Sequence, residues 1–330
     1  MVGYSVFVTR DIPEDGLDLL RAEGCGVTVR SSQEIPTTDE IIEGIRDREA
    51  LLCLLTDPVD SDVIGAGRNL KIIANYAVGY NNIDVSAATE RGIIITNTPG
   101  VLTDTTAEMA WALLMSVARR IVEADRYSRS GAFKRWESNL LLGSDVHGKT
   151  LGIIGLGRIG RAFAKRSLGF DMRVIYHNRK RVDPDVEEEL GAEYVDLDTL
   201  LEESDFISIH APLTSETRHM IGARELGLMK GTAYLINTSR GPVIDEEALA
   251  DALSSGKIAG AGLDVYEEEP VINPKLLERD NVVLTPHIGS GSVETRTKMS
   301  VMAAENIIAA MRGERPPNII NPEVLAKDFD

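Results

Sequence analysis

The chain has 330 residues, enough for about two domains that each bury a core of their own. Its formal net charge of −17 argues against nucleic acid as a partner, because contact with phosphates needs a basic face. No run approaches the ~18 apolar residues of a membrane span, and the amino terminus lacks the pattern of a secretory signal, so a cytoplasmic protein is expected. The two cysteines, Cys25 and Cys53, stand in or beside apolar segments and are predicted to be reduced, buried thiols.

Short apolar runs alternate with amphipathic stretches in the first part of the chain. The runs cover 4–8, 26–29, 51–55, 71–74 and 92–96, and two of the stretches between them cover 14–22 and 38–45. This alternation predicts a doubly wound parallel sheet, in which ligands gather at the carboxyl ends of strands. Leu54 and the segment 75–82 stand at two such ends. Pattern alone favours a simple turn for 75–82; the alternative is a loop whose backbone N–H groups near Val78 and Gly79 hold an anion.

A helix is predicted next, with Thr105 and Glu108 in the spacing of a capping box. From 109 to 118 it is apolar almost all round, so we expect it to be buried between domains or between subunits. The segment 131–146 is irregular and carries large apolar side chains. Because an exposed apolar arm is a liability in a monomer, the chain is expected to form a homodimer.

The stretch 150–181 holds the most specific local signal. An apolar run, 150–154, leads into Gly155-Leu156-Gly157-Arg158-Ile159-Gly160, which is followed by good helix formers and a second apolar run at 173–176. Gly155 suits a tight turn, Gly157 lets the backbone approach a pyrophosphate, and Gly160 lets the helix pack on the strand. Such glycines can form only a turn, but within a strand–turn–helix–strand unit of this length they favour a dinucleotide site at the helix N-terminus.

Strand and helix signals continue to the end of the chain. Further apolar runs cover 206–209, 233–237, 261–265 and 282–285, with a helix predicted at 246–253. A last helix carries Met299 and Ile307 on one stripe. The proline-rich segment 316–322 is predicted to be an extended strap.

Three of these strand ends place one ionisable side chain each: Arg240, Glu269 and His287. Because strand ends in one sheet converge on one crevice, the three residues can meet although they are far apart in sequence. Arg240 can pair with a carboxylate or carbonyl oxygen, His287 can donate a proton to that oxygen as a hydride reaches the carbon, and Glu269 can orient the imidazole and favour its protonated form. Together they suit reduction of a 2-oxo acid. Singly, each also fits a surface arginine, a solvated glutamate or a loop histidine.

Four strings resemble signatures of the D-isomer-specific 2-hydroxyacid dehydrogenases: Gly155-Leu-Gly-Arg-Ile-Gly160, Asn237-Thr-Ser-Arg-Gly241, Gly262-Leu-Asp-Val-Tyr-Glu-Glu-Glu-Pro270 and Thr285-Pro-His-Ile-Gly-Ser290. They occur in family order, and the resemblance runs over nearly the whole chain. Within the family, Asn75-Tyr-Ala-Val-Gly-Tyr80 and Gly148-Lys-Thr-Leu-Gly152 are most similar to the glyoxylate and hydroxypyruvate reductases.

The resemblance implies a flavodoxin-like substrate domain of residues 1–99 plus 288–330 and an inserted Rossmann nucleotide domain, 100–287. It implies Arg240 as the substrate-binding arginine, Glu269 as the partner of the histidine and His287 as the acid/base. The implied substrate-binding set is Leu54, Val78, Gly79, Arg240 and His287, with Val78 and Gly79 on the carboxylate. The implied cofactor-binding set is Gly155, Leu156, Gly157, Arg158, Ile159, Gly160, Asn178, Arg179, Lys180, His210, Ala211, Pro212, Thr217, Thr238, Ser239, Arg240, Asp264 (on the nicotinamide carboxamide), His287, Gly289 and Ser290. No metal site is expected.

Two departures from the family pattern concern specificity. In NAD-specific members an acidic residue ends the second strand of the nucleotide unit, whereas this chain has Asn178 followed by Arg179 and Lys180. Loss of the anion and gain of cations favour NADP(H) over NAD(H), while the plainer interpretation is a solvated basic turn. Leu140 stands where some hydroxypyruvate reductases carry tryptophan, so glyoxylate and hydroxypyruvate both stay open as the small 2-oxo acid.

Two other functions fit parts of the pattern. Phosphoglycerate dehydrogenases share the family motifs, but many of them carry an additional C-terminal regulatory domain, which is not expected here. Some transcriptional corepressors share the scaffold and sense NAD(H). The small size of the chain, the lack of a disordered interaction tail and the intact Arg240, Glu269 and His287 argue against that role.

Overall fold

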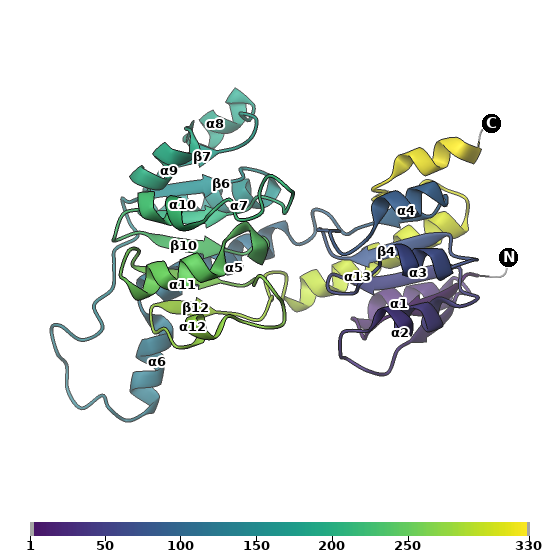
Figure 1. Cartoon of the computed structure of the whole chain (residues 1–330), viewed down its shortest axis with the longest axis horizontal. Helices are drawn as coiled ribbons and strands as arrows, with labels where there is room; N and C mark the ends of the chain where they lie inside the picture. The colour runs from purple at the N-terminus through teal and green to yellow at the C-terminus, as the bar shows by residue number, and fades with distance from the viewer. Residues whose placement is uncertain (1–2, 329–330) are drawn as a thin grey trace. The chain divides into compact units, whose positions relative to one another are not determined.

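The computed structural model describes residues 3–328, which form two compact units (Figure 1). Unit 1 comprises residues 1–102 and 291–330, and unit 2 comprises residues 103–290. The family resemblance placed the divisions after residues 99 and 287, whereas the compact units divide after residues 102 and 290. Unit 2 is therefore inserted as one block into the chain of unit 1.

Unit 1 is built on a parallel sheet in the order β2-β1-β3-β4-β5. Its strands are β1 (Ser5–Val8), β2 (Gly26–Val29), β3 (Ala50–Leu54), β4 (Ile72–Tyr76) and β5 (Ile94–Thr96). The side chains of β1, β3 and β4 are almost wholly buried, as expected of parallel strands covered on both faces. This order is the flavodoxin-like one, so the predicted architecture of the unit is confirmed.

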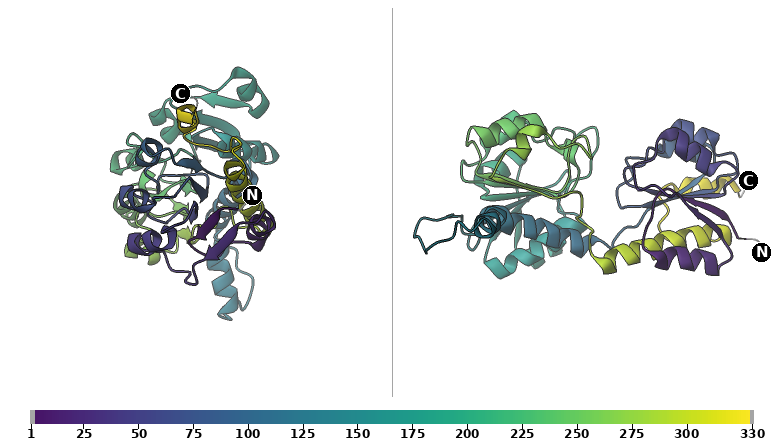
Figure 2. Two further views of the ribbon diagram at one scale, coloured as in Figure 1. Left: turned by 90° about the vertical axis from the view of Figure 1, so that its right-hand side faces the viewer. Right: turned by 90° about the horizontal axis from the view of Figure 1, so that it is seen from below.

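Helices cover both faces of the sheet in unit 1 (Figure 2). On one face, α1 (Glu14–Ala22) packs beside α13 (Val293–Met311). On the other lie α2 (Thr38–Ile45), α3 (Ser61–Ala66) and α4 (Val85–Glu90). α1 and α2 have the predicted bounds, and α2 begins with a capping box in which Thr37 and Glu40 each accept a backbone N–H of the other.

The chain after α13 is the predicted strap along the edge of this sheet. Ile319 pairs in antiparallel fashion with Thr96 of β5, and the Ile320 N–H donates to the Ile95 carbonyl at 2.8 Å. A short 3-10 helix, η3 (Pro322–Asp328), follows. The strap thus shields the open edge of β5, which would otherwise present unpaired backbone groups.

Unit 2 is built on a parallel sheet in the order β12-β11-β10-β9-β6-β7-β8. The strands are β6 (Thr150–Ile154), β7 (Arg173–His177), β8 (Ala192–Tyr194), β9 (Phe206–Ile209), β10 (Tyr234–Asn237), β11 (Gly260–Leu263) and β12 (Val282–Leu284). Read from β8 this is the Rossmann order, with the reversal between β6 and β9, so the predicted nucleotide-domain fold is confirmed.

Two apolar clusters sandwich the sheet of unit 2, one on each face. The first involves α9 (Leu197–Glu203), α10 (Ala223–Leu228) and α11 (Glu246–Ser254), and the second involves α5 (Thr103–Ala118), α7 (Arg158–Ser167) and α8 (Pro184–Leu190). The short α12 (Pro274–Leu277) precedes β12. In the described range, 3–328, no helix combines the length and the apolar character needed to cross a bilayer.

Helix α5 differs from its prediction in two ways. It begins at Thr103, so Thr105 lies inside the first turn and is not the capping residue. The chain already turns at Gly100, whose φ of 86° suits glycine, and this lets the helix start earlier than the capping-box spacing indicated. Burial on every side was also only partly right, because Met109 is half-buried and Ala112 is exposed.

An arm projects from unit 2 after α6 (Ile121–Arg129), at the lower left of Figure 1. No residue of α6 is buried. The irregular segment that follows exposes Phe133, Trp136 and Leu142, with Trp136 81% exposed. The predicted apolar arm is therefore present and is uncovered within a single chain.

Candidate functional site

The imidazole of His287 and the carboxylate of Glu269 are hydrogen-bonded in unit 2. The distance from Nδ1 of His287 to Oε2 of Glu269 is 2.7 Å, and both side chains are mostly buried. The other carboxylate oxygen, Oε1, accepts the backbone N–H of Tyr266, which fixes the orientation of Glu269. Burial alone would raise the pKa of Glu269, but the hydrogen bond from His287 and the nearby positive charges hold that pKa below its ordinary value. The carboxylate is therefore ionised at neutral pH.

Arg240 lies within electrostatic reach of this pair. It follows β10, and its guanidinium is largely buried; that burial lowers its pKa, while the charge of Glu269 opposes the shift. Its Nη1 donates to the carbonyl of Ser239 at 2.7 Å, and its own carbonyl accepts from the amide of Asn237 at 3.0 Å. The three predicted catalytic residues thus meet at one place in unit 2, linked in the order Arg240, Glu269, His287.

Asp264 holds the loop that carries His287. Its buried carboxylate accepts from Thr285 Oγ1 at 2.6 Å, from the Ile288 N–H at 2.8 Å and from the Gly289 N–H at 2.6 Å. The His287 N–H donates to the Asp264 carbonyl at 2.9 Å, and His287 itself has a left-handed φ of 52°. Burial raises the pKa of Asp264 against these donors. The structure therefore gives Asp264 a role inside the loop, beside the cofactor contact that the resemblance implies.

The glycine loop has the geometry that its sequence predicts. Gly155 has a φ of 98°, and a side chain there would meet the backbone of Ala211 at 2.7 Å. A Cβ on Gly160 would lie 2.3 Å from the Gly155 carbonyl oxygen, whereas one on Gly157 would meet nothing within 4 Å. Gly157 is also the N-cap of α7, and the first turn of that helix, which contains Arg158 and Ile159, holds no acidic side chain. The Gly157 N–H itself donates to the Gly155 carbonyl at 2.9 Å, so Gly157 supplies room for an anion and the first turn of α7 supplies the N–H groups.

The residues of the basic turn after β7 differ in their hydrogen-bond partners. Asn178 accepts the Leu156 N–H on its side-chain oxygen at 2.6 Å, so it braces the glycine loop. Arg181 is engaged with Glu187 through two hydrogen bonds, and Arg181 and Tyr176 lower the pKa of that carboxyl to about 2. Arg179 and Lys180 are exposed and make no hydrogen bond within the described part of the chain.

The remaining predicted cofactor residues follow the ends of β9, β10 and β12. Burial lowers the pKa of His210 to about 3, so its ring is neutral at pH 7; its Nε2 lies 2.9 Å from Ser208 Oγ. Thr217 Oγ1 donates to the Pro212 carbonyl at 2.7 Å. The residues found at these strand ends are His210, Ala211, Pro212, Thr217, Thr238, Ser239, Gly289 and Ser290. The hydroxyl of Thr238 is buried and has no hydrogen-bond partner within residues 3–328.

The predicted substrate residues of unit 1 stand at the carboxyl ends of β3 and β4. Leu54 is the last residue of β3, and its N–H donates to Asp57 Oδ2 at 2.7 Å. Val78 and Gly79 follow β4 and are half-buried. Their carbonyls accept from the amide groups of Asn97 and Asn75, each at 2.8 Å. The carbonyls of this segment are thus fixed by two side-chain amides.

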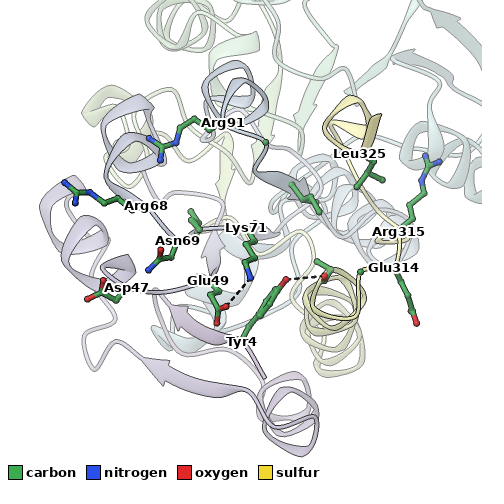
Figure 3. Close-up of a pocket in the computed structure, with 15 residues that line it drawn as sticks. Tyr4, Asp47, Glu49, Arg68, Asn69, Lys71, Arg91, Glu314, Arg315 and Leu325 are labelled. Atoms are coloured by element: carbon green, nitrogen blue, oxygen red, sulfur yellow. Dashed lines mark hydrogen bonds and ion pairs between the residues drawn. The ribbon is translucent and has the colours of Figure 1, made fainter. Parts of the chain in front are cut away.

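A hollow of about 880 Å³ lies at the opposite, amino end of the same strands (Figure 3). Its floor holds Tyr4 and the ion pair of Lys71 with Glu49, whose Nζ–Oε1 distance is 3.3 Å. Its basic and acidic side chains nearly balance: Arg68, Lys71, Arg91 and Arg315 against Asp47, Glu49 and Glu314. The hollow contains none of the predicted site residues.

Metal ligands and cysteines contribute no further site. Across residues 3–328, no three His, Cys, Asp or Glu side chains are grouped so that they could hold a metal ion. Cys25 and Cys53 are free and buried, as predicted. Burial raises the pKa of both thiols, so neither is an activated nucleophile.

Comparison with known proteins decides between the families that share this fold. The D-isomer specific 2-hydroxyacid dehydrogenase NAD binding domain matches residues 111–289. Over 322 residues, 97% of this chain and 96% of the relative, the sequence is 56% identical to the glyoxylate reductase of Korarchaeum cryptofilum. The chain belongs to the D-isomer-specific 2-hydroxyacid dehydrogenase family.

Two solved structures of such dehydrogenases are also similar. A glyoxylate reductase from Paecilomyes thermophila has a TM-score of 0.87 and 35% identity, covering 98% of this chain and 100% of that one. The NADPH-dependent glyoxylate/hydroxypyruvate reductase of Sinorhizobium meliloti, solved with NADP and malonate, has a TM-score of 0.85 and 34% identity, covering 96% of both chains.

The sequence alone missed several residues that shape this dehydrogenase site. Asp57 accepts the Leu54 N–H at the end of β3, and Asn75 and Asn97 bind the carbonyls of Gly79 and Val78. None of the three could be told from an ordinary loop residue by type or spacing. The signal that existed was positional: Asn75 stands inside a strand whose five residues are all buried, and a buried amide needs hydrogen-bond partners.

Proposed function

We propose that this dehydrogenase reduces glyoxylate to the 2-hydroxy acid with NAD(P)H. The observation that carries the proposal is the His287–Glu269 hydrogen bond beside Arg240, an arrangement that suits a proton donor, its orienting carboxylate and an anion-binding guanidinium. The identity to a named glyoxylate reductase over nearly the whole chain supports the choice of 2-oxo acid. Hydroxypyruvate is the second candidate, because a structural relative is named for both substrates.

The residues of unit 2 fit a dinucleotide. The open space at Gly157, the unpartnered hydroxyl of Thr238 and the absence of carboxylates in the first turn of α7 all suit an anionic ligand with polar groups. When bound, the reduced nicotinamide supplies the hydride. The glycine loop 155–160 would hold the pyrophosphate, and the residues after β9, β10 and β12 would line the rest of the cofactor.

The side chains then have distinct tasks. Arg240 binds the carboxylate or carbonyl oxygen of the substrate through its planar fork of donors. His287 gives a proton from Nε2 to the carbonyl oxygen as that oxygen becomes an alcohol, because its Nδ1 is already engaged with Glu269. Glu269 keeps the ring in place and stabilises the positive charge that the imidazole carries before transfer. The N–H groups of Val78 and Gly79 bind the substrate carboxylate.

For the cofactor we infer a preference for NADP(H). Asn178 supplies no carboxylate to bind ribose hydroxyls or to repel a 2′-phosphate, and Arg179 and Lys180 are exposed cations without hydrogen bonds in the described chain. Arg181 does not support the inference, since Glu187 already occupies it. The NADP seen in a structural relative supports the same preference.

We also infer a homodimer in which the arm after α6 is covered by a second copy. The support is the exposure of Phe133, Trp136 and Leu142, at 59%, 81% and 63%. A cytoplasmic location stays a prediction, supported by the two buried free thiols.

One steady-state panel tests the proposed function. Glyoxylate, hydroxypyruvate, pyruvate and phosphohydroxypyruvate are each assayed with NADPH and with NADH. We expect the highest kcat/KM for glyoxylate with NADPH, and activity abolished in His287→Ala while NADPH affinity stays near normal. Absence of turnover with every 2-oxo acid, together with tight NAD(P)H binding, would instead support a nucleotide-sensing protein.

A further inference from the structure

In the described part of unit 1, three successive peptide groups accept hydrogen bonds on their carbonyls but donate none from their N–H groups. The Ala77 carbonyl accepts from the Thr98 N–H at 2.9 Å, and the Val78 carbonyl accepts from Asn97 Nδ2 at 2.8 Å. The Gly79 carbonyl accepts from Asn75 Nδ2 at 2.8 Å. The N–H groups that belong to the same peptides, those of Val78, Gly79 and Tyr80, have no hydrogen-bond partner within residues 3–328.

The geometry of the peptide bond shows where the N–H groups of Val78 and Gly79 point. These peptides are trans, so each carbonyl and the N–H that follows it point in opposite directions. The carbonyls of Ala77 and Val78 both point toward the neighbouring residues Thr98 and Asn97. The N–H groups of Val78 and Gly79 must therefore both point to the other side, where they can bind one anion together.

We propose that Asn97 is a positioning residue for the carboxylate of the substrate. Its side-chain amide fixes the peptide between Val78 and Gly79, and so aims the Gly79 N–H beside that of Val78. Asn97 is itself fixed from behind: its N–H donates to the Asn318 carbonyl at 3.3 Å, and its carbonyl accepts from Asn306 Nδ2 at 3.4 Å. α13 and the strap thus hold the residue that aims the loop. The inference rests on the proposed function, since it concerns how the carboxylate of that substrate is bound.

The test compares two variants with a matched control. Asn97→Ala removes the donor, and Asn97→Asp removes it while keeping the shape of the side chain. The control is Asn281→Ala, because Asn281 Nδ2 makes the same kind of bond, to the Ala259 carbonyl at 3.2 Å, in unit 2. Loss of one aiming hydrogen bond should raise the KM for glyoxylate about five- to tenfold in both Asn97 variants. The kcat, the KM for NADPH and the melting temperature should change little, and the control should keep the wild-type KM.

A second readout separates failure of this inference from failure of the proposed function. Oxalate, a carboxylate that is not reduced, should bind the wild-type enzyme–NADPH complex and bind about five- to tenfold more weakly to Asn97→Ala. If wild type turns over no 2-oxo acid, the proposed function fails. If wild type is active and folded Asn97→Ala keeps its KM for glyoxylate and its oxalate affinity, Asn97 does not position the loop. A rise in KM confined to Asn97→Asp would mean charge repulsion alone and would equally overturn the inference.

Discussion

Replacing Glu269 by glutamine tests the pairing on which the proposed chemistry depends. Glutamine keeps an oxygen for the Tyr266 N–H, which Glu269 accepts at 3.0 Å, but it removes the negative charge 2.7 Å from His287 Nδ1. A hydrogen bond to a charged group is worth about 1.5–3 kcal/mol, which corresponds to about a 10- to 150-fold loss in kcat/KM for glyoxylate. Both side chains are mostly buried, which favours the upper part of that range, because water screens the pair only partly.

The pH profile gives the sign of the effect. The pKa of Glu269 is held below its ordinary value, so the carboxylate is charged over the neutral range and is neutralised only when the pH falls through that lowered pKa. The wild-type rate should therefore fall on the acid side, and Glu269→Gln, which has no carboxylate to neutralise, should lack that fall. The assay is kcat/KM for glyoxylate from pH 4 to 9, with Glu268→Gln, an exposed neighbour, as control. A Glu269→Gln enzyme with the wild-type rate and pH profile would refute the pairing.

Three further expectations follow from other parts of the molecule. Asn178→Asp combined with Arg179→Ala should shift the ratio of kcat/KM for NADPH and NADH at least tenfold toward NADH, whereas Arg181→Ala should not, because Glu187 already holds that guanidinium. Light scattering after gel filtration should show a dimer for wild type and a monomer for a variant with serine at Phe133 and Trp136; a monomeric wild type would contradict the interface. Raising ionic strength from about 0.01 to 0.15 M should increase kcat/KM for glyoxylate, since the Debye length falls from about 30 to 8 Å and screens the net charge of −17; a decrease would show that local cations dominate.

Local sequence signals were sufficient to predict most strands of the two sheets and the glycine loop. The unit β6–α7–β7 was predicted because its apolar runs and glycines are adjacent in sequence, and only the start of α7, at Arg158, came earlier than the helix formers suggested. β8 was missed because it is a three-residue edge strand with two exposed residues, so its composition carries no burial signal. The pairing of Glu269 with His287 was expected from strand ends and from family motifs, and its geometry agrees with that expectation.

Contacts between segments that are far apart in the chain could not be predicted from the sequence. The pairing of Ile319 with Thr96 joins residues more than 200 positions apart, and nothing in a proline-rich segment says which edge it will cover. The hydrogen bond from the Leu156 N–H to Asn178 was equally unforeseen. The sequence indicated only that Asn178 replaces a carboxylate, whereas its amide oxygen also accepts a hydrogen bond from the glycine loop. In both cases the residue type permits the contact, and the packing of other elements decides it.

Both candidate anion sites use backbone N–H groups, a choice that suits a strongly acidic protein. With 52 acidic and 35 basic residues, a surface cation tends to be captured by a neighbouring carboxylate, as Arg181 is by Glu187. Backbone N–H groups carry no net charge that an acidic neighbour could neutralise, yet they attract an anion strongly at short range. At Val78 and Gly79 the N–H groups have no partner within residues 3–328, and Asn97 binds the carbonyl of Val78. At α7 the N–H groups of the first turn are those that a helix leaves unbonded, while Asn178 accepts the N–H of Leu156 in the preceding loop. Under the proposed function, such peptide groups would hold the anionic groups of cofactor and substrate in this acidic chain, and the buried guanidinium of Arg240 would add its charge at the substrate.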